Sequence, residues 1–435
     1  MTGVLLASAW LAIFLFLAHR LSFFQLPGLS RWEISALLLL KVAASGALWA
    51  VYTFHYTDRA SADLFKYFDD SAIMHDALRT HPADHFKMIT GIGDDDPAIK
   101  ENHYVRMNNW YRQYEGNLYN DSHTMIRYNA LLRMVSFGHF SVHAVITAFL
   151  AFLGACAMFR ALLPVLPGKE RALAAVLFLV PSVLFWCSGV IKESLLLLGL
   201  GLLLYSWMSM VRGRIRSSHL ALLLFSLYGL LFLKFYVLLC LLPGLVAWTW
   251  SARTGHKGAW WKFLSVHLAF VLIGLSVHLV FPGYDVIEIL WTKQKDFIGM
   301  ATGVNAGSFV MPDPLEKNVW SFVAHVPHAL YTTLLGPMFH PGAGLPGMVA
   351  AIENGFLLVV LAWMLTRTGR IGRDQLDLVL MCIGFAGLLS LVIGWTTPVM
   401  GAVVRYRAPM IPFLLVAALA LMDPSRMPFR STPRP

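Results

Sequence analysis

About eleven apolar stretches, each near the length that crosses a bilayer, recur along this chain and leave few folds open to it. Backbone polar groups inside a membrane must be satisfied within the segment itself, so such stretches form helices. Charged residues make up only 13% of the sequence, about half the share found in soluble domains. The sequence therefore predicts an all-α, polytopic transmembrane bundle. The expected spans are 3–19, 34–54, 138–160, 172–187, 193–211, 217–233, 235–252, 262–281, 348–366, 375–396 and 403–422.

These spans divide the chain into five parts, two of which are long connections. The expected parts are two spans in 1–54, a partly helical loop in 55–137, a central bundle in 138–281, a re-entrant segment in 282–347, and the last spans with a tail in 348–435. The four cysteines all fall in apolar stretches, which argues against a disulfide scaffold.

The distribution of basic residues predicts the orientation of the spans. Alternate connections carry half of the chain's 34 Lys and Arg residues but only four acids, whereas the connections between them are neutral or acidic. Excess Lys and Arg mark cytoplasmic loops, so the N-terminus is expected outside and the C-terminus inside. The basic set comprises Arg20, Arg31, Arg160, Lys169, Arg171, Arg212, Arg214, Arg216, Arg253, Lys257, Lys262, Arg367, Arg370, Arg373, Arg426, Arg430 and Arg434.

Several charged residues fall on very short turns at the opposite, outer face. They are Lys192 and Glu193, Lys234, and Arg405 with Arg407, which flank Tyr406. Charges at the membrane boundary indicate function by default, although simple snorkelling to the headgroups is the alternative. Arginine forks match phosphate oxygens, so these residues are candidates for binding a lipid-linked phosphate.

The loop 55–137 carries acids that can serve in catalysis. Helical spacing of apolar residues over 62–78 predicts a helix that lies flat on the membrane with its aromatic rings at headgroup level. Asp63, Asp69 and Asp70 come soon after the second span, where a carboxylate can act as a general base. The alternative is a solvated helix face. No metal site is expected, because the histidines lack zinc-ligand spacing, although the run Asp94–Asp96 leaves a divalent metal open.

The stretch from Arg405 through Pro409 to Pro412, together with Asp69 and Asp70 in the first large outer loop, resembles the GT-C superfamily of membrane glycosyltransferases. The stretch Pro181–Glu193, with Tyr119–Asn129 before it, is similar to bacterial membrane proteins encoded with exopolysaccharide genes. The resemblance covers most of the chain and rests on short motifs. One departure is that the acidic loop follows the second span rather than the first, which leaves the O-antigen polymerase group as a second resemblance.

The resemblance implies an enzyme of the bacterial plasma membrane that transfers a sugar from a polyprenyl-phosphate-linked donor at the extracytoplasmic face. An acid among Asp63, Asp69 and Asp70 would be the base, and Arg405, Arg407 and Lys192 would stabilise the leaving phosphate. Alternatives are a polysaccharide polymerase and a lipid-linked glycan transporter without chemistry. The expected partners are the lipid-linked substrate and membrane lipids, with no nucleic acid and no cofactor.

A last expectation concerns the charges at the outer face. Lys192, Glu193, Arg405 and Arg407 are expected at similar depth although they are far apart in the sequence. Burial of charges near hydrocarbon is tolerable when they pair or meet an anionic ligand. We therefore expect Glu193 to pair with Lys192, Arg405 or Arg407, which leaves a net positive pocket for the lipid phosphate.

Overall fold

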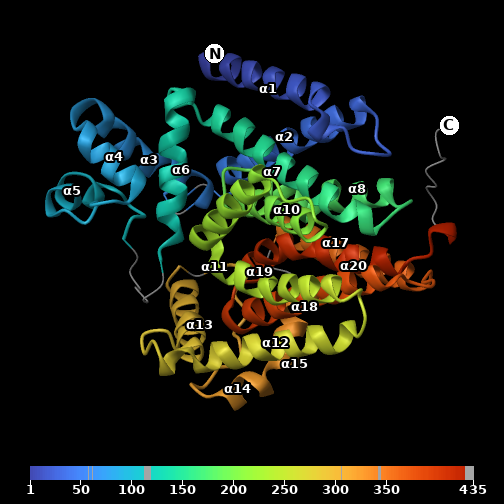
Figure 1. Cartoon of the computed structure of the whole chain (residues 1–435). Helices are drawn as coiled ribbons and strands as arrows, with labels where there is room; N and C mark the ends of the chain where they lie inside the picture. The colour runs from blue at the N-terminus through green and yellow to red at the C-terminus, as the bar shows by residue number, and fades with distance from the viewer. Residues whose placement is uncertain (57, 61, 112–118, 305, 341–343, 427–435) are drawn as a thin grey trace. The chain divides into compact units, whose positions relative to one another are not determined.

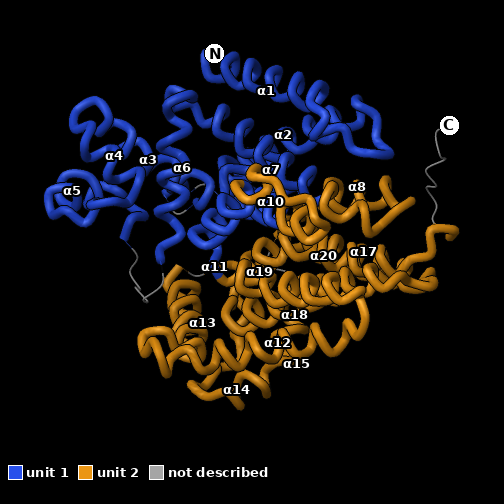
Figure 2. Tube along the Cα trace, in the orientation of Figure 1, with its two compact units in different colours: residues 1–158, 184–203, 222–235 blue, residues 159–183, 204–221, 236–435 orange. Residues whose placement is uncertain are grey.

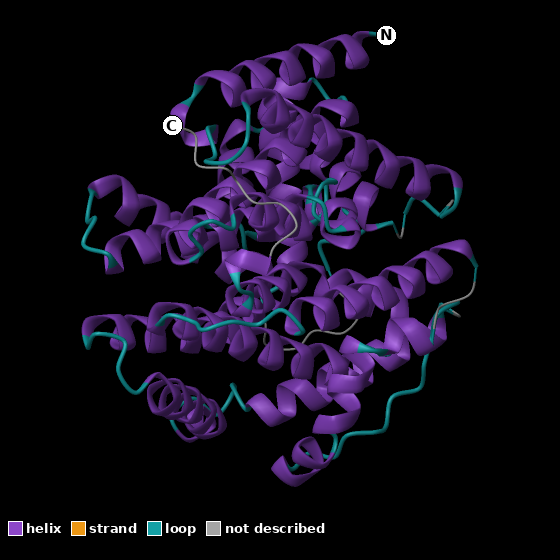
Figure 3. Ribbon diagram, turned by 90° about the vertical axis from the view of Figure 1, so that its right-hand side faces the viewer, coloured by secondary structure: helices purple, strands orange, loops and turns teal. Residues whose placement is uncertain are grey.

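The structure is helical throughout the part of the chain that it describes, which confirms the all-α prediction (Figure 3). The computed structural model describes residues 1–56, 58–60, 62–111, 119–304, 306–340 and 344–426. Within these ranges, extended pairing is limited to two isolated bridges, Phe309 with Val399 and Thr368 with Met422.

The chain folds into two compact units (Figure 2). Unit 1 consists of Met1–Met158, Leu184–Leu203 and Leu222–Phe235. Unit 2 consists of Phe159–Val183, Leu204–Ala221 and Tyr236–Pro435.

The helices of unit 1 come from the expected outer loop and from the spans before and after it (Figure 1). They are α1 (Thr2–Arg20), α2 (Arg31–Phe54), α3 (Asp63–Thr80), α4 (Pro82–Thr90), α5 (Pro97–Asn102), α6 (Asp121–Ser136), most of α7 (Phe140–Leu162), the first part of α10 (Lys192–Val211) and a middle part of α11 (Ser217–Arg253). Short 3-10 turns occur at Ser22–Phe24 and Tyr104–Arg106.

Unit 2 holds the remaining helices. They are α8 (Glu170–Phe178), the start of α9 (Pro181–Trp186), α12 (Ala259–Ser276), α13 (Val286–Gly303), α14 (Val319–Ala324), α15 (Val326–Leu334), α16 (Gly336–Phe339), α17 (Leu345–Leu365), α18 (Arg373–Thr396), α19 (Met400–Arg407) and α20 (Ile411–Leu421). Its 3-10 turns are Leu163–Val165, Val277–Leu279, Ala408–Met410 and Pro424–Arg426.

Nine helices in the described ranges are long and apolar enough to cross a membrane, rather than the eleven expected. The expected span 172–187 is two short helices, α8 and α9, because Pro181 begins α9 and disfavours helical backbone in the residue before it. The expected spans 217–233 and 235–252 are the two helical segments of the 37-residue α11. This helix is interrupted at Lys234, whose φ of −152° and ψ of 79° are not helical.

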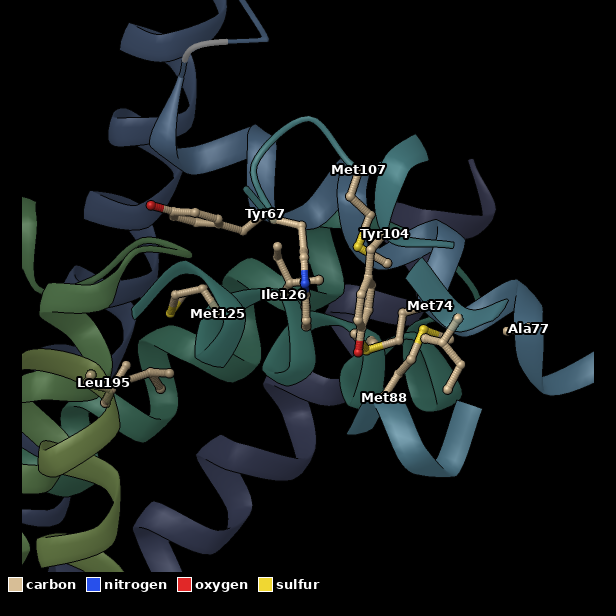
Figure 4. Packing of buried hydrophobic residues seen from close by; sticks show 13 residues of the cluster. Tyr67, Met74, Ala77, Met88, Tyr104, Met107, Met125, Ile126 and Leu195 are labelled. Carbon is tan, nitrogen blue, oxygen red and sulfur yellow. The ribbon is translucent and has the colours of Figure 1, made fainter. Parts of the chain in front are cut away.

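The expected outer loop supplies most of an apolar core, to which Leu195 of α10 and Leu233 of α11 also contribute. Met74 of α3 and Met88 of α4 pack with Tyr104, Met125 and Ile126, and the rings and thioethers interdigitate in Figure 4. The predicted helix over 62–78 is present as α3, but its rings do not face headgroups. Phe65, Tyr67 and Phe68 are buried against other parts of unit 1, so that expectation is wrong.

Within unit 2, the two ends of α18 contact different parts of the chain. Near its start, Gln375 donates to the carbonyl of Val165, and a carboxylate oxygen of Asp377 forms a hydrogen bond with Nδ1 of His256. Val165 and His256 lie in or beside the basic connections. Near its end, the carbonyl of Trp395 accepts from Gln294 of the expected re-entrant segment. The basic connections and the segment 282–347 therefore contact opposite ends of one candidate span, α18.

The segment 282–347 forms helices α13 to α16, interrupted near His325 and at Leu335, as its prolines and glycines predicted. α15 approaches α18 so closely that a Cβ on Gly394 would lie 2.1 Å from the carbonyl oxygen of Ala329. Only glycine fits at position 394, so α15 packs directly against the candidate span α18.

Candidate functional site

The starts of three helices in unit 1 bring together charged residues from distant parts of the sequence. α3 begins at Asp63, α6 at Asp121 and α10 at Lys192. α3 and α6 pack along one another, and Asn120 caps α6 by accepting a hydrogen bond from the amide of Ser122. We call the group Asp63, Lys66, Tyr67, Asp121 and Lys192 the charged cluster.

Lys192 is the link between the long loop and the central bundle. Its Nζ lies 3.0 Å from a carboxylate oxygen of Asp121 and 4.9 Å from the centre of the Tyr67 ring. The Lys192 side chain is almost fully buried, whereas Asp121 stays partly open. The start of α6, at the end of the loop 55–137, and the start of α10 therefore lie side by side in unit 1.

Asp63 completes the cluster from the first turn of α3. It forms an ion pair with Lys66, and the hydroxyl of Tyr67 donates to Asp63 Oδ1 at 3.4 Å. Burial raises the pKa of Tyr67, and the charge of Asp63 raises it further, so the phenol keeps its proton. Burial lowers the pKa of Lys66, but the charge of Asp63, the hydrogen bond to Asp63 and the neighbouring Tyr67 together outweigh burial, and the net shift is upward.

Tyr67 joins this polar cluster to the apolar core of unit 1. Its ring packs with the core residues, while its hydroxyl points away from Met74 and Met88 (Figure 4). The ring therefore fixes the start of α3 against the core. Its hydroxyl donates to Asp63, and its face lies beside the ammonium of Lys192.

Glu193 pairs with a different base from those expected. Its Oε1 accepts from Nζ of Lys234 at 3.0 Å, and both side chains are buried. Lys234 is the residue at which α11 departs from helical geometry. The expectation that Glu193 pairs with Lys192, Arg405 or Arg407 is therefore corrected. Asp121 and Glu193 balance Lys192 and Lys234 in charge, and the expected net positive pocket, which includes Arg405 and Arg407, stays a prediction.

Asp69 and Asp70 have unrelated environments although they are neighbours. Asp69 lies at the surface in a bidentate pair with Arg59, with distances of 2.7 and 2.8 Å. Asp70 is buried, and its two oxygens accept from the amides of Asn108 and Asn109 and from the Asn109 side chain. Burial raises the pKa of Asp70, and these hydrogen bonds offset part of the rise. Its contacts are those of a residue that fixes a loop.

The arginines before the last span belong to unit 2. Arg405 and Tyr406 are half-buried and in contact, with the guanidinium 5.4 Å from the ring centre. Arg407 is buried, and its Nη1 donates to the carbonyls of Thr333 and Leu334 and to Oδ1 of Asn354. Their convergence with Lys192 stays a prediction, because the two groups lie in different units.

Within the described ranges, no group of three or more His, Cys, Asp or Glu side chains is arranged to hold a metal ion. The run Asp94–Asp96 is engaged instead in local contacts: Asp94 accepts from Arg127 and Tyr104, and Asp96 caps α5.

Sequence reasoning missed Lys66, Tyr67 and Asp121 as members of the site. In the sequence, Asp121 is recognisable only as the residue after the helix cap Asn120. No neighbouring residue indicates that it pairs with Lys192. Comparisons of the chain with protein-family models, curated proteins and solved structures give no match. The site therefore has to be interpreted from its own geometry.

Proposed function

We propose that the protein is a membrane glycosyltransferase that moves a sugar from a polyprenyl-phosphate-linked donor to an acceptor hydroxyl at the extracytoplasmic face, in the synthesis of a cell-surface glycan. The observation that supports this proposal is the charged cluster, in which an acid, a second acid and a buried lysine meet at one face of a membrane-embedded unit. Ionisable groups gathered at such a boundary are typical of a functional site.

Asp63 is the best-placed base among the three acids that the sequence singled out. Asp63 and Lys192 both contact Tyr67. Asp69 instead pairs with Arg59 at the surface, and the two oxygens of Asp70 accept hydrogen bonds from Asn108 and Asn109. Asp63 is also partly exposed, so an acceptor hydroxyl has access to it. In the proposed reaction the hydroxyl proton passes to Asp63, the hydroxyl oxygen attacks the anomeric carbon, and the bond from that carbon to the phosphate oxygen breaks.

Lys192 is the proposed partner of the leaving phosphate at this site. Its pairing with Asp121 holds the ammonium in place before substrate arrives, and preorganised charge is worth more than charge that must reorient. Asp121 is a positioning residue in this scheme, since it acts through Lys192.

The test replaces Asp63 by Asn, which keeps its size and removes its capacity to accept a proton. Loss of activity on the order of a hundredfold or more is expected, with the protein still inserted and folded. The measurement is the surface glycan made by cells that carry each variant, normalised to protein in the membrane. Asp69→Asn is the matched comparison on the same helix.

Two outcomes would change this assignment. Full activity of Asp63→Asn together with loss in Asp69→Asn would transfer the base to Asp69. Accumulation of single lipid-linked repeats in place of a long glycan would indicate the polymerase alternative.

A further inference from the structure

α11 is interrupted at Lys234, and two other helices of unit 1 attach to it beside this interruption. Residues 222–235 of α11 belong to unit 1, together with α6 and the start of α10. A break in a helix deprives nearby carbonyls of their regular donors, so those groups need partners from elsewhere. The partners come from the two helices that carry Asp121 and Lys192.

The first contact joins α6 to the turn just before the break. The hydroxyl of Thr124 donates to the carbonyl oxygen of Phe232 at 2.8 Å. Tyr119 supports the same contact, because its hydroxyl lies 3.2 Å from that of Thr124 and its ring meets the Phe232 ring edge-on, with 4.9 Å between the ring centres. Thr124 lies one turn along α6 from Asp121, on the same side of the helix. The contact therefore fixes the helix start that presents Asp121 to Lys192.

The second contact joins α10 to the break itself. Nζ of Lys234 lies 3.0 Å from Oε1 of Glu193, and the two side chains are 5% and 0% exposed. An ion pair buried this deeply is costly to break, because either charge alone would lack its partner. Glu193 follows Lys192 directly in the first turn of α10, so the pair that holds Glu193 also holds the backbone of Lys192.

We infer that the interruption of α11 positions the Asp121–Lys192 pair, with Thr124 holding the acid and the Glu193–Lys234 pair holding the lysine. The acid and the lysine are thereby attached to neighbouring positions of α11, and they keep their distance without relying on their own attraction alone. Lys234 is a positioning residue in this arrangement, whereas the sequence made it a candidate for binding the phosphate. Only the catalytic use of Lys192 rests on the proposed function; the contacts hold for any reaction.

The test measures how firmly Lys192 is held, without any sugar transfer. The full-length protein in detergent is treated briefly with acetic anhydride, which acylates amines, and the rate at which each lysine is modified is followed by mass spectrometry of its peptides. Lys192 should react slowly in the natural protein, because its side chain is 9% exposed and paired. Lys87, whose side chain is 42% exposed, is the internal reference and should react at the same rate in every folded variant.

Thr124→Val removes the first contact and keeps the shape of the side chain. The modification rate of Lys192 should rise about fivefold, the order expected when one hydrogen bond is lost. Thr124→Ser restores a hydroxyl and should return the rate to that of the natural protein. Ser226→Ala is the matched control, because it also removes a hydroxyl in unit 1, but that hydroxyl donates to the carbonyl of Leu223 in its own helix.

The double variant Glu193→Gln with Lys234→Met removes the second contact. Replacing both partners leaves neither charge without the other, which keeps the cost to folding small. The modification rate of Lys192 should rise about tenfold, since hydrogen bonds to charged groups are the stronger ones.

An unchanged rate for Lys192 in both Thr124→Val and the double variant would overturn the inference. An equal rise in Ser226→Ala would overturn it too, because the effect would then be general loosening of unit 1. The surface glycan of the same cells separates this result from the proposed function. Faster modification of Lys192 with undiminished glycan would support the positioning and would remove Lys192 from the proposed reaction.

Discussion

Asp69 and Asp70 show how strongly the environment of one residue decides its role. Asp70 holds Asn108 and Asn109 through three hydrogen bonds, and Asp69 forms a surface pair. Asn at position 70 keeps one acceptor oxygen and turns an NH₂ group toward donors. Asp70→Asn should therefore lower the free energy of unfolding by about 1–3 kcal/mol, and Asp69→Asn by less than about 1 kcal/mol.

Unfolding of the purified protein in detergent, followed by circular dichroism, measures both changes. A larger loss in Asp69→Asn than in Asp70→Asn would contradict the structural role given to Asp70. Asp69 and Asp70 are adjacent and chemically identical in the sequence. The difference between the two losses of unfolding free energy therefore measures the effect of burying Asp70.

At the scale of elements, α7 and α10 cross in unit 1 through two glycines. A Cβ on Gly201 would lie 1.9 Å from the carbonyl oxygen of Gly154, and one on Gly154 would lie 2.5 Å from that of Leu197. These contacts are with backbone, which cannot rotate away, so the helices must separate to admit a methyl group. Small residues at such crossings let helices approach closely in membranes.

Gly201→Ala should therefore destabilise the protein by about 1–3 kcal/mol. Gly229→Ala in α11 is the control, because a Cβ there meets nothing within 4 Å and alanine favours the helix. Thermal unfolding of the two variants in the same detergent provides the measurement. Equal melting temperatures would mean that α7 and α10 are further apart than the structure shows.

At the scale of the whole molecule, the prediction concerns the two sides of the membrane. Basic connections are expected inside, and the loop 55–137 and the segment 282–347 outside. Reporter fusions after Arg216 and after Gly93 should therefore report opposite sides. The same side for both fusions would overturn the map, including the extracytoplasmic placement of the charged cluster.

Local sequence patterns were enough to predict much of the helical architecture. Span length and hydropathy predicted most of the membrane-crossing helices, because burial in lipid depends on composition over about 20 residues. The cap before Asp121 follows from the local effect of one residue, Asn120. The helix starts at Val326 and Gly336 follow in the same way, because each has a proline in its first turn. The expected span 172–187 is instead divided at Pro181, whereas the expected boundary between 217–233 and 235–252 coincides with the break in α11 at Lys234.

The partners of the charges were decided only by the tertiary structure. Lys192 meets Asp121, and Glu193 meets Lys234, across long separations in sequence. A buried charge requires a partner, so the sequence can indicate that Glu193 has one. Which residue it is depends on how the helices pack, and no local pattern carries that information. The same reason separates the environment of Asp63 from those of Asp69 and Asp70.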